Sequence, residues 1–152
     1  KIKAKYPKSV FKLLGAIDDN PSCISQVYLD LVIGEGIIEY QGPSADVRSH
    51  LAESEVFVLP SYREGTPRSV LEALAVGLPV ITTDAPGCRE TVIDGKNGFL
   101  IPVKDIDGLV NAMECLLIDE ERRLEMGEVS LQLAREKYDV NIVNEQILCA
   151  LL

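Results

Sequence analysis

Residues 61–78 constrain this chain most, because they predict a glycine-containing turn that opens directly into a helix. The apolar run at residues 56–59 comes just before and predicts a buried strand. Thr66 is expected to cap the helix and Pro67 to occupy its first position, where the missing N–H costs nothing. The N-terminus of a helix carries unpaired N–H groups and partial positive charge. The stretch therefore predicts a seat for a phosphate or diphosphate.

Two carboxylates bracket this helix end, Glu64 in the turn and Glu72 within the helix. If the helix begins at Pro67, Glu72 lies about 7–8 Å along the axis, and its side chain leans back toward the N-terminus. A diphosphate at the helix end would then have one carboxylate near each of its two substituents, which suits a nucleotide-sugar. The alternative interpretation of Glu72 is an ordinary surface ion pair with Arg68, four residues earlier.

Strand and helix patterns alternate along the whole chain. Expected strands cover residues 11–17, 37–41, 56–59, 79–82 and 99–103. Expected helices cover residues 23–33, 46–54, 67–76, 120–138 and 141–151, with another starting at residue 105 and one or two turns at 88–93. Nearly all-apolar strands between helices predict an α/β fold with a Rossmann-like open parallel sheet, covered by helices on both faces.

Ligands of open parallel sheets bind at the carboxyl ends of the strands. The turns that follow four of the expected strands should therefore open onto one rim of the sheet. These turns carry Asp18, Gln41, Glu64 and Gly87.

Composition excludes several classes of function. A length of 152 residues fits one domain, and a formal net charge of −9 argues against binding of nucleic acid. No apolar run is long enough to span a membrane and no leader precedes the first strand, so a cytoplasmic protein is expected. The four cysteines lie far apart, which favours reduced thiols. Asp105 and Asp107 are expected at a helix start, as capping residues rather than metal ligands, and neither a metal nor a cofactor is expected.

The spacing Glu64-x7-Glu72, together with Gly87-Cys-Arg-Glu90, resembles the signature of the retaining glycosyltransferases of family four, which have the GT-B fold. The resemblance runs from about residue 11 to residue 138 and includes Asp-Gly-Lys-Asn-Gly-Phe-Leu-Ile-Pro at residues 94–102. It implies the donor-binding half of an enzyme that transfers a hexose or N-acetylhexosamine from a UDP-sugar.

The resemblance also implies roles for single residues. Glu64 is implied as the catalytic residue, which contacts hydroxyls of the donor sugar without forming a covalent glycosyl-enzyme, and Glu72 is implied to hold the ribose hydroxyls. Main-chain groups near Tyr40 and Gln41 would face the base. For Glu90 the alternative is an ordinary acidic residue favoured by a helix dipole. The implied substrate-binding residues are Tyr40, Gln41, Gly65, Thr66, Pro67, Arg68, Ser69, Leu71, Glu72, Gly87 and Glu90.

The residues of these motifs are similar to those of family members that extend lipid-diphosphate-linked sugars. This implies a glycan or polyprenyl-diphosphate-linked acceptor, bound through an N-terminal domain that the sequence lacks, and peripheral association with the inner face of the membrane. An Arg and a Lys that neutralise the diphosphate in the family are also missing from the start of the chain. The sequence is therefore expected to be one domain of a larger enzyme, inactive alone. The alternative is a non-catalytic nucleotide-sugar-binding or interaction module of the same fold.

Overall fold

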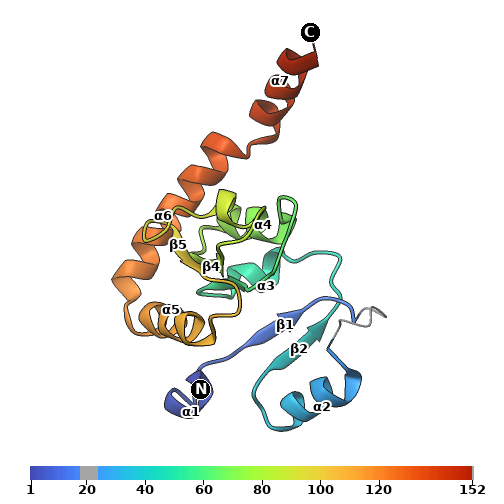
Figure 1. The fold of residues 1–152 in the computed structure, drawn as a ribbon, viewed down its shortest axis with the longest axis vertical. Coiled ribbons are helices and arrows are strands. Elements are labelled where there is room, and N and C mark those ends of the chain that lie inside the picture. The colour runs from blue at the N-terminus through green and yellow to red at the C-terminus, as the bar shows by residue number, and fades with distance from the viewer. Residues whose placement is uncertain (18–23, 152) are drawn as a thin grey trace. The chain divides into compact units, whose positions relative to one another are not determined.

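The computed structural model describes residues 1–17 and 24–151 and divides the chain into two compact units, Lys1–Val47 and Arg48–Leu152. Asp18 of the expected rim and Cys23, where a helix was expected to begin, lie outside the described residues. The smaller unit contains helix α1 (Ile2–Lys5), strand β1 (Lys12–Leu14), helix α2 (Gln26–Gly34) and strand β2 (Glu39–Gly42) (Figure 1).

In the smaller unit, β1 and β2 form a parallel pair in which Leu13 lies opposite Tyr40. Helix α2 begins after Ser25, because the side chain of Ser25 accepts a hydrogen bond from the N–H of Tyr28 at 3.3 Å. This capping bond places the start of the helix later than the apolar spacing predicted.

The larger unit contains the remaining elements (Figure 1). They are α3 (Arg48–Ala52), β3 (Phe57–Leu59), α4 (Arg68–Val76), β4 (Val80–Thr83), the 3₁₀ turn η1 (Arg89–Thr91), β5 (Gly98–Ile101), α5 (Ile106–Ile118), α6 (Glu120–Lys137) and α7 (Val140–Leu151). Among the helices of the described ranges, none combines the length and apolar character needed to cross a membrane.

The α/β class and the parallel pairing of the strands are confirmed. Strands β3, β4 and β5 form a parallel sheet in that order, with Leu59 opposite Thr82 and Thr83 opposite Ile101. The five strands of the described residues belong to two sheets, β1-β2 and β3-β4-β5, and not to the single sheet that the sequence predicted. Apolar runs identify strands, but they do not specify which strands pair.

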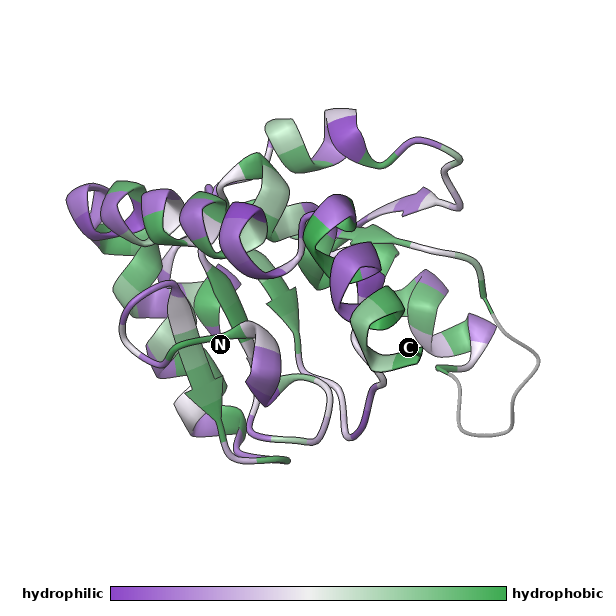
Figure 2. Ribbon diagram, turned by 90° about the horizontal axis from the view of Figure 1, so that it is seen from above, coloured by the Kyte–Doolittle hydropathy of each residue, from purple (hydrophilic) through white to green (hydrophobic). Residues whose placement is uncertain are grey.

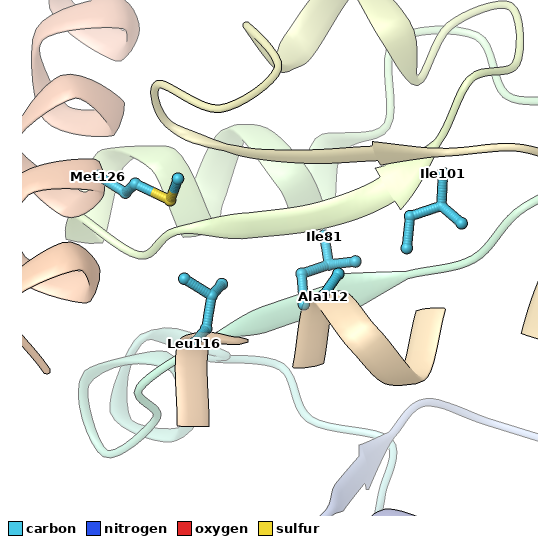
Figure 3. Close-up of a cluster of buried hydrophobic side chains, with 5 residues drawn as sticks. All are labelled: Ile81, Ile101, Ala112, Leu116 and Met126. Atoms are coloured by element: carbon cyan, nitrogen blue, oxygen red, sulfur yellow. The ribbon is translucent and has the colours of Figure 1, made fainter. Parts of the chain in front are cut away.

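Helices cover both faces of the three-stranded sheet. All four residues of β4 are buried, and both α4 and α5 contact this strand. On one face Ile81 packs with residues of β5, α5 and α6 in an apolar cluster (Figure 3). Because neighbouring side chains of a strand point to opposite faces, Val80 and Thr82 face away from this cluster. The cluster consists of Ile81, Ile101, Ala112, Leu116 and Met126.

Figure 2 shows the strands of this unit as largely hydrophobic, whereas the helices mix hydrophilic and hydrophobic residues.

The ends of several elements differ from the expected ones by one to three residues. Strand β5 ends at Ile101 and not at residue 103, because the N–H of Asp105 donates to the carbonyl of Pro102 at 3.1 Å and closes a turn. The side chain of Asp105 accepts from the N–H of Gly108 at 2.8 Å, so the expected cap of α5 is confirmed.

A fully buried asparagine fixes the loop between η1 and β5. The Oδ1 atom of Asn97 accepts from the N–H of Ile93 at 2.7 Å, and its Nδ2 atom donates to the carbonyl of Thr91 at 3.3 Å. The main-chain carbonyl of Asn97 accepts from the N–H of Val80 at 3.0 Å, at the start of β4. One side chain therefore positions the entry into the central strand.

We expect Asn97→Ala to lower the free energy of unfolding by about 2–4 kcal/mol, because one buried and one partly buried hydrogen bond are lost and the truncated side chain leaves a cavity. Urea denaturation measures this change. Asn144→Ala, at an exposed position of α7, is the control and should alter stability by less than about 0.5 kcal/mol. Equal losses in the two variants would contradict the role of the buried amide.

Candidate functional site

Helix α4 begins one residue later than the sequence predicted. Pro67 is its N-cap, with extended backbone angles φ −69° and ψ 112°, and the carbonyl of Pro67 accepts from the N–H groups of Val70 and Leu71 at 3.0 and 3.3 Å. The expectation that Thr66 caps the helix is therefore wrong, and so is the placement of Pro67 at the first helical position. Thr66 precedes the cap, and α4 has no side-chain capping bond.

The start of α4 keeps the open amides that the sequence predicted. The N–H groups of Arg68 and Ser69 make no hydrogen bond within the part of the chain that the structure describes. These amides lie at the positive end of the helix dipole, where an anionic group is favoured. The first turn of α4 can therefore bind a phosphate.

The turns that follow β3 and β4 touch through their backbones. The N–H of Glu64 donates to the carbonyl of Pro86 at 3.0 Å. Gly87 has φ +84°, and a Cβ atom there would lie 1.8 Å from the carbonyl oxygen of Gly65 and 2.3 Å from that of Glu64. Only glycine fits between them. Two turns of the expected rim, those of Glu64 and Gly87, thus lie together at the carboxyl ends of adjacent strands.

The carboxylate of Glu64 is held by a hydroxyl group that follows the end of β3 by two residues. Its Oε1 atom accepts from the hydroxyl of Ser61 at 2.7 Å, and the side chain is half-buried. The carbonyl of Ser61 in turn accepts from the buried hydroxyl of Thr83 on β4. A second threonine of β4, Thr82, donates to the carbonyl of Leu59 at 2.8 Å. These bonds leave Glu64 with a defined position next to the turn pair.

Glu72 lies in the second turn of α4 and is exposed. Val70, Ala73 and Leu74 of the same helix are fully buried and pack into the core. Within the described residues Glu72 forms no ion pair with Arg68, the alternative that the sequence left open. The carboxylate is therefore available to a ligand.

The loop that carries Glu90 is tied to the end of α6. The main-chain carbonyl of Glu90 accepts from the Nζ atom of Lys137 at 2.7 Å and from the hydroxyl of Tyr138 at 2.6 Å, while the Glu90 side chain is exposed. In the same loop the Nε atom of Arg89 pairs with Asp84 at 2.8 Å. The turn after β4 is thus fixed at both of its ends.

Tyr40 and Gln41 belong to β2 of the smaller unit. The hydroxyl of Tyr40 donates to the carbonyl of Gly15 at 2.8 Å, and Gln41 is exposed. Their expected contact with a base stays a prediction.

Sequence reasoning missed three supporting residues of the site. Ser61 could have been found, because it lies three residues before Glu64 in the same turn. Thr83 and Tyr138 carry no comparable signal, since their partners are 22 and 48 residues away along the chain.

The family comparison covers most of the chain. The model of a family described as "Glycosyl transferases group 1" matches residues 3–132. Among curated proteins, the N,N'-diacetylbacillosaminyl-diphospho-undecaprenol alpha-1,3-N-acetylgalactosaminyltransferase of Campylobacter jejuni is 37% identical over 141 residues, which are 93% of this chain and 36% of that protein. The chain therefore spans about a third of the length of this relative.

A second relative and one solved structure agree with this match. The UDP-Gal:alpha-D-GlcNAc-diphosphoundecaprenol alpha-1,3-galactosyltransferase of Escherichia coli is 44% identical over 68 residues, covering 45% of this chain and 18% of that protein. The crystal structure of Anabaena Alr3699/HepE in complex with UDP superimposes with a TM-score of 0.84 at 24% identity, over 95% of this chain and 41% of that one. This structural likeness shows a shared fold.

Proposed function

Because this chain belongs to the glycosyl transferases of group 1, we propose that it forms the nucleotide-sugar-binding half of a retaining glycosyltransferase. In the full enzyme a hexose or N-acetylhexosamine passes from a UDP-sugar to a glycan or lipid-linked acceptor. The α/β fold with parallel strands is that of GT-B glycosyltransferases. Residues 1–152 act as one donor-binding domain of this enzyme, and a separate domain binds the acceptor.

One observation carries the proposal: the turn pair of Glu64 and Gly87 lies beside the open amides at the start of α4. The N–H of Glu64 donates to the carbonyl of Pro86, and the amides of Arg68 and Ser69 lack partners among the described residues. A diphosphate bound at these amides has a fixed carboxylate, Glu64, in the preceding turn and an exposed carboxylate, Glu72, one helical turn further on. This arrangement suits a sugar on one side of a diphosphate and a ribose on the other.

The residues of the two turns and of the start of α4 contact different parts of the donor. Glu64 orients the donor sugar, and the backbone of Gly65, Thr66 and Gly87 shapes the surface against which the sugar lies. The buried Pro67 contributes shape only, since it has no N–H. The amides of Arg68 and Ser69 bind the diphosphate.

Four further residues complete the proposed donor site. Glu90 lies near the sugar, on the loop held by the end of α6. Leu71, in the first turn of α4, is half-buried and supports the helix end that receives the diphosphate. Main-chain groups of Tyr40 and Gln41 face the base.

In the proposed reaction, the bond between the anomeric carbon and the diphosphate oxygen breaks, and a bond to the acceptor oxygen forms on the same face of the sugar. The acceptor hydroxyl gives its proton to the departing diphosphate. The positive end of α4 stabilises the negative charge that develops on this leaving group. Glu64 acts by orientation, without forming a covalent intermediate.

The names of the two relatives support the nature of the substrates. The Escherichia coli protein is named for a UDP-galactose donor, and both proteins are named for sugars linked to diphosphoundecaprenol. Undecaprenol is a membrane lipid, so we propose that the full enzyme works at the inner face of the membrane, as a peripheral protein.

Calorimetry with UDP and 2′-deoxy-UDP tests the proposed function. We expect Glu72→Ala to weaken UDP binding by about 10-fold or more, because hydrogen bonds to a charged carboxylate contribute about 1.5–3 kcal/mol. The wild-type chain should prefer UDP over 2′-deoxy-UDP, and the variant should lose this preference.

Glu128→Ala is the matched control, since it removes an exposed glutamate from α6, away from the proposed site. It should bind UDP like the wild type. Equal affinity of wild type and Glu72→Ala for UDP would count against the proposed role in binding ribose. No binding of UDP by the wild-type chain would overturn the proposed function.

A further inference from the structure

Lys104 occupies a backbone conformation that lysine rarely adopts. Its φ is +69°, and it is the one non-glycine residue with positive φ among residues 1–17 and 24–151. Residues 102–105 form a turn closed by the bond from the N–H of Asp105 to the carbonyl of Pro102. Lys104 is the third residue of this turn, a place where a positive φ strongly favours glycine.

The surrounding bonds prevent the turn from relaxing. The side chain of Asp105 caps α5 by accepting from the N–H of Gly108 at 2.8 Å, and the carbonyl of Lys104 accepts from the N–H of Ile106 at 3.1 Å. The start of α5 thus imposes the conformation of Lys104. Glycine would adopt it without strain, so the lysine side chain is retained at an energetic cost, which is typical of functional positions.

The ammonium group of Lys104 is held by an aromatic ring. Its Nζ atom lies 5.7 Å from the centre of the Tyr62 ring, in the range of a cation–π contact. Tyr62 follows the last residue of β3 by three positions, and Lys104 follows the last residue of β5 by three. The pair therefore connects the two outer strands at the same sheet edge as the turn pair of Glu64 and Gly87. Tyr62 is 67% exposed, so the pair is open to solvent.

This edge carries several basic side chains, in a chain of net charge −9. Within the described part of the chain, Arg63, Arg68 and Lys104 form no ion pair. Of the nearby acidic residues, Asp84 is paired with Arg89 and Asp105 caps α5. The carboxylates of Glu64, Glu72 and Glu90 form no ion pair within the described residues and are assigned to hydroxyl groups of the donor. The three cations are thus available to an anion with more than one negative charge.

We propose that Lys104, held in place by Tyr62, binds a diphosphate group of a substrate. The proposal rests on the proposed function above, in which both the donor and a lipid-linked acceptor carry a diphosphate ester. Lys104 follows β5, and its ammonium lies against Tyr62, two residues before Glu64 in the turn that follows β3. Lys104 supplies a full positive charge, whereas the amides supply the partial charges of the helix end.

Calorimetry on the 152-residue chain tests the proposal with Lys104→Gly. The probes are UDP, as the donor diphosphate, and farnesyl diphosphate, as a short polyprenyl diphosphate; uridine and farnesol are their uncharged counterparts. We expect the variant to bind at least one diphosphate about threefold to tenfold more weakly and to bind uridine and farnesol unchanged. Its melting temperature should equal or exceed that of the wild type, because glycine relieves the strained φ.

The matched control is Lys96→Ala, which removes an exposed lysine from the turn before β5, at the other end of that strand. It should bind both diphosphates like the wild type. Tyr62→Ala should weaken binding less than Lys104→Gly, and it should add nothing in the Lys104→Gly background, because both changes act on one contact.

Each outcome has a definite meaning. Weaker binding of UDP alone assigns Lys104 to the donor, and weaker binding of farnesyl diphosphate alone assigns it to the acceptor. Unchanged binding of both diphosphates overturns the proposal, and if Glu72→Ala still weakens UDP binding, the proposed function stands without it. If the wild-type chain binds neither diphosphate, both are wrong.

Discussion

Gly87→Ala is expected to lower the free energy of unfolding by at least about 2 kcal/mol and to abolish UDP binding. The new Cβ atom would lie 1.8 Å from the carbonyl oxygen of Gly65 and 2.3 Å from that of Glu64, so the two turns must move apart. This movement breaks the bond from the N–H of Glu64 to the carbonyl of Pro86 and displaces the Glu64 carboxylate. Urea denaturation and calorimetry with UDP measure the two effects.

Gly95→Ala is the control for Gly87→Ala, because it introduces the backbone strain of a positive φ without the steric overlap of the new Cβ atom. Gly95 has φ +74°, close to the φ of +84° at Gly87, but a Cβ atom there meets nothing within 4 Å. We expect Gly95→Ala to cost only the left-handed conformation, about 1–2 kcal/mol, and to leave UDP affinity intact. If Gly87→Ala bound UDP as the wild type does, the turn pair would not form the binding surface.

Glu64→Gln is expected to reduce sugar transfer by about 100-fold or more in the assembled two-domain enzyme. The substitution keeps the size of the side chain and can keep the bond from the Ser61 hydroxyl, but it removes the charge beside the reacting sugar. UDP binding should change little, because Glu64 is proposed to contact the sugar and not the nucleotide. The rate is measured with a UDP-sugar and a lipid-diphosphate acceptor, and affinity with UDP alone.

Ser61→Ala is the companion variant for this experiment. It keeps the carboxylate of Glu64 but removes the hydroxyl that holds its Oε1 atom at 2.7 Å. We expect a smaller loss of rate, about threefold to tenfold, because a single hydrogen bond contributes about 0.5–1.5 kcal/mol. If Glu64→Gln transferred sugar at the wild-type rate, the assignment of Glu64 as the catalytic residue would be wrong.

Local patterns predicted much of the fold. The apolar runs located each of the five strands in residues 1–17 and 24–151, and Asp105 was identified as the cap of α5. The long helix α6 was predicted almost to its ends, because charged and apolar residues recur along it without an interruption. The start of α4 was predicted one residue too early. There a proline can serve either as the N-cap or as the first helical residue, and only its ψ of 112° decides between them.

The division of the strands into two sheets could not be predicted in the same way. Pairing depends on which strand edges lie next to each other after the helices have packed, and strand sequences carry little information on this. The hydrogen bonds that support the site could not be predicted for the same reason, because they join segments that meet only after packing. Tyr138 reaches the carbonyl of Glu90 only because α6 returns to the loop after β4.

The sequence by itself determined the strand, turn and helix at residues 56–76, the two carboxylates eight positions apart and the family to which the chain belongs. These features depend on neighbours in the chain, so short-range rules suffice to identify them. Only the tertiary structure decided that Gly87 packs against the turn of Glu64 and that Lys104 meets Tyr62 across the sheet. These contacts join loops 22 or more residues apart, because parallel strands bring their carboxyl ends to one edge whatever their separation in sequence.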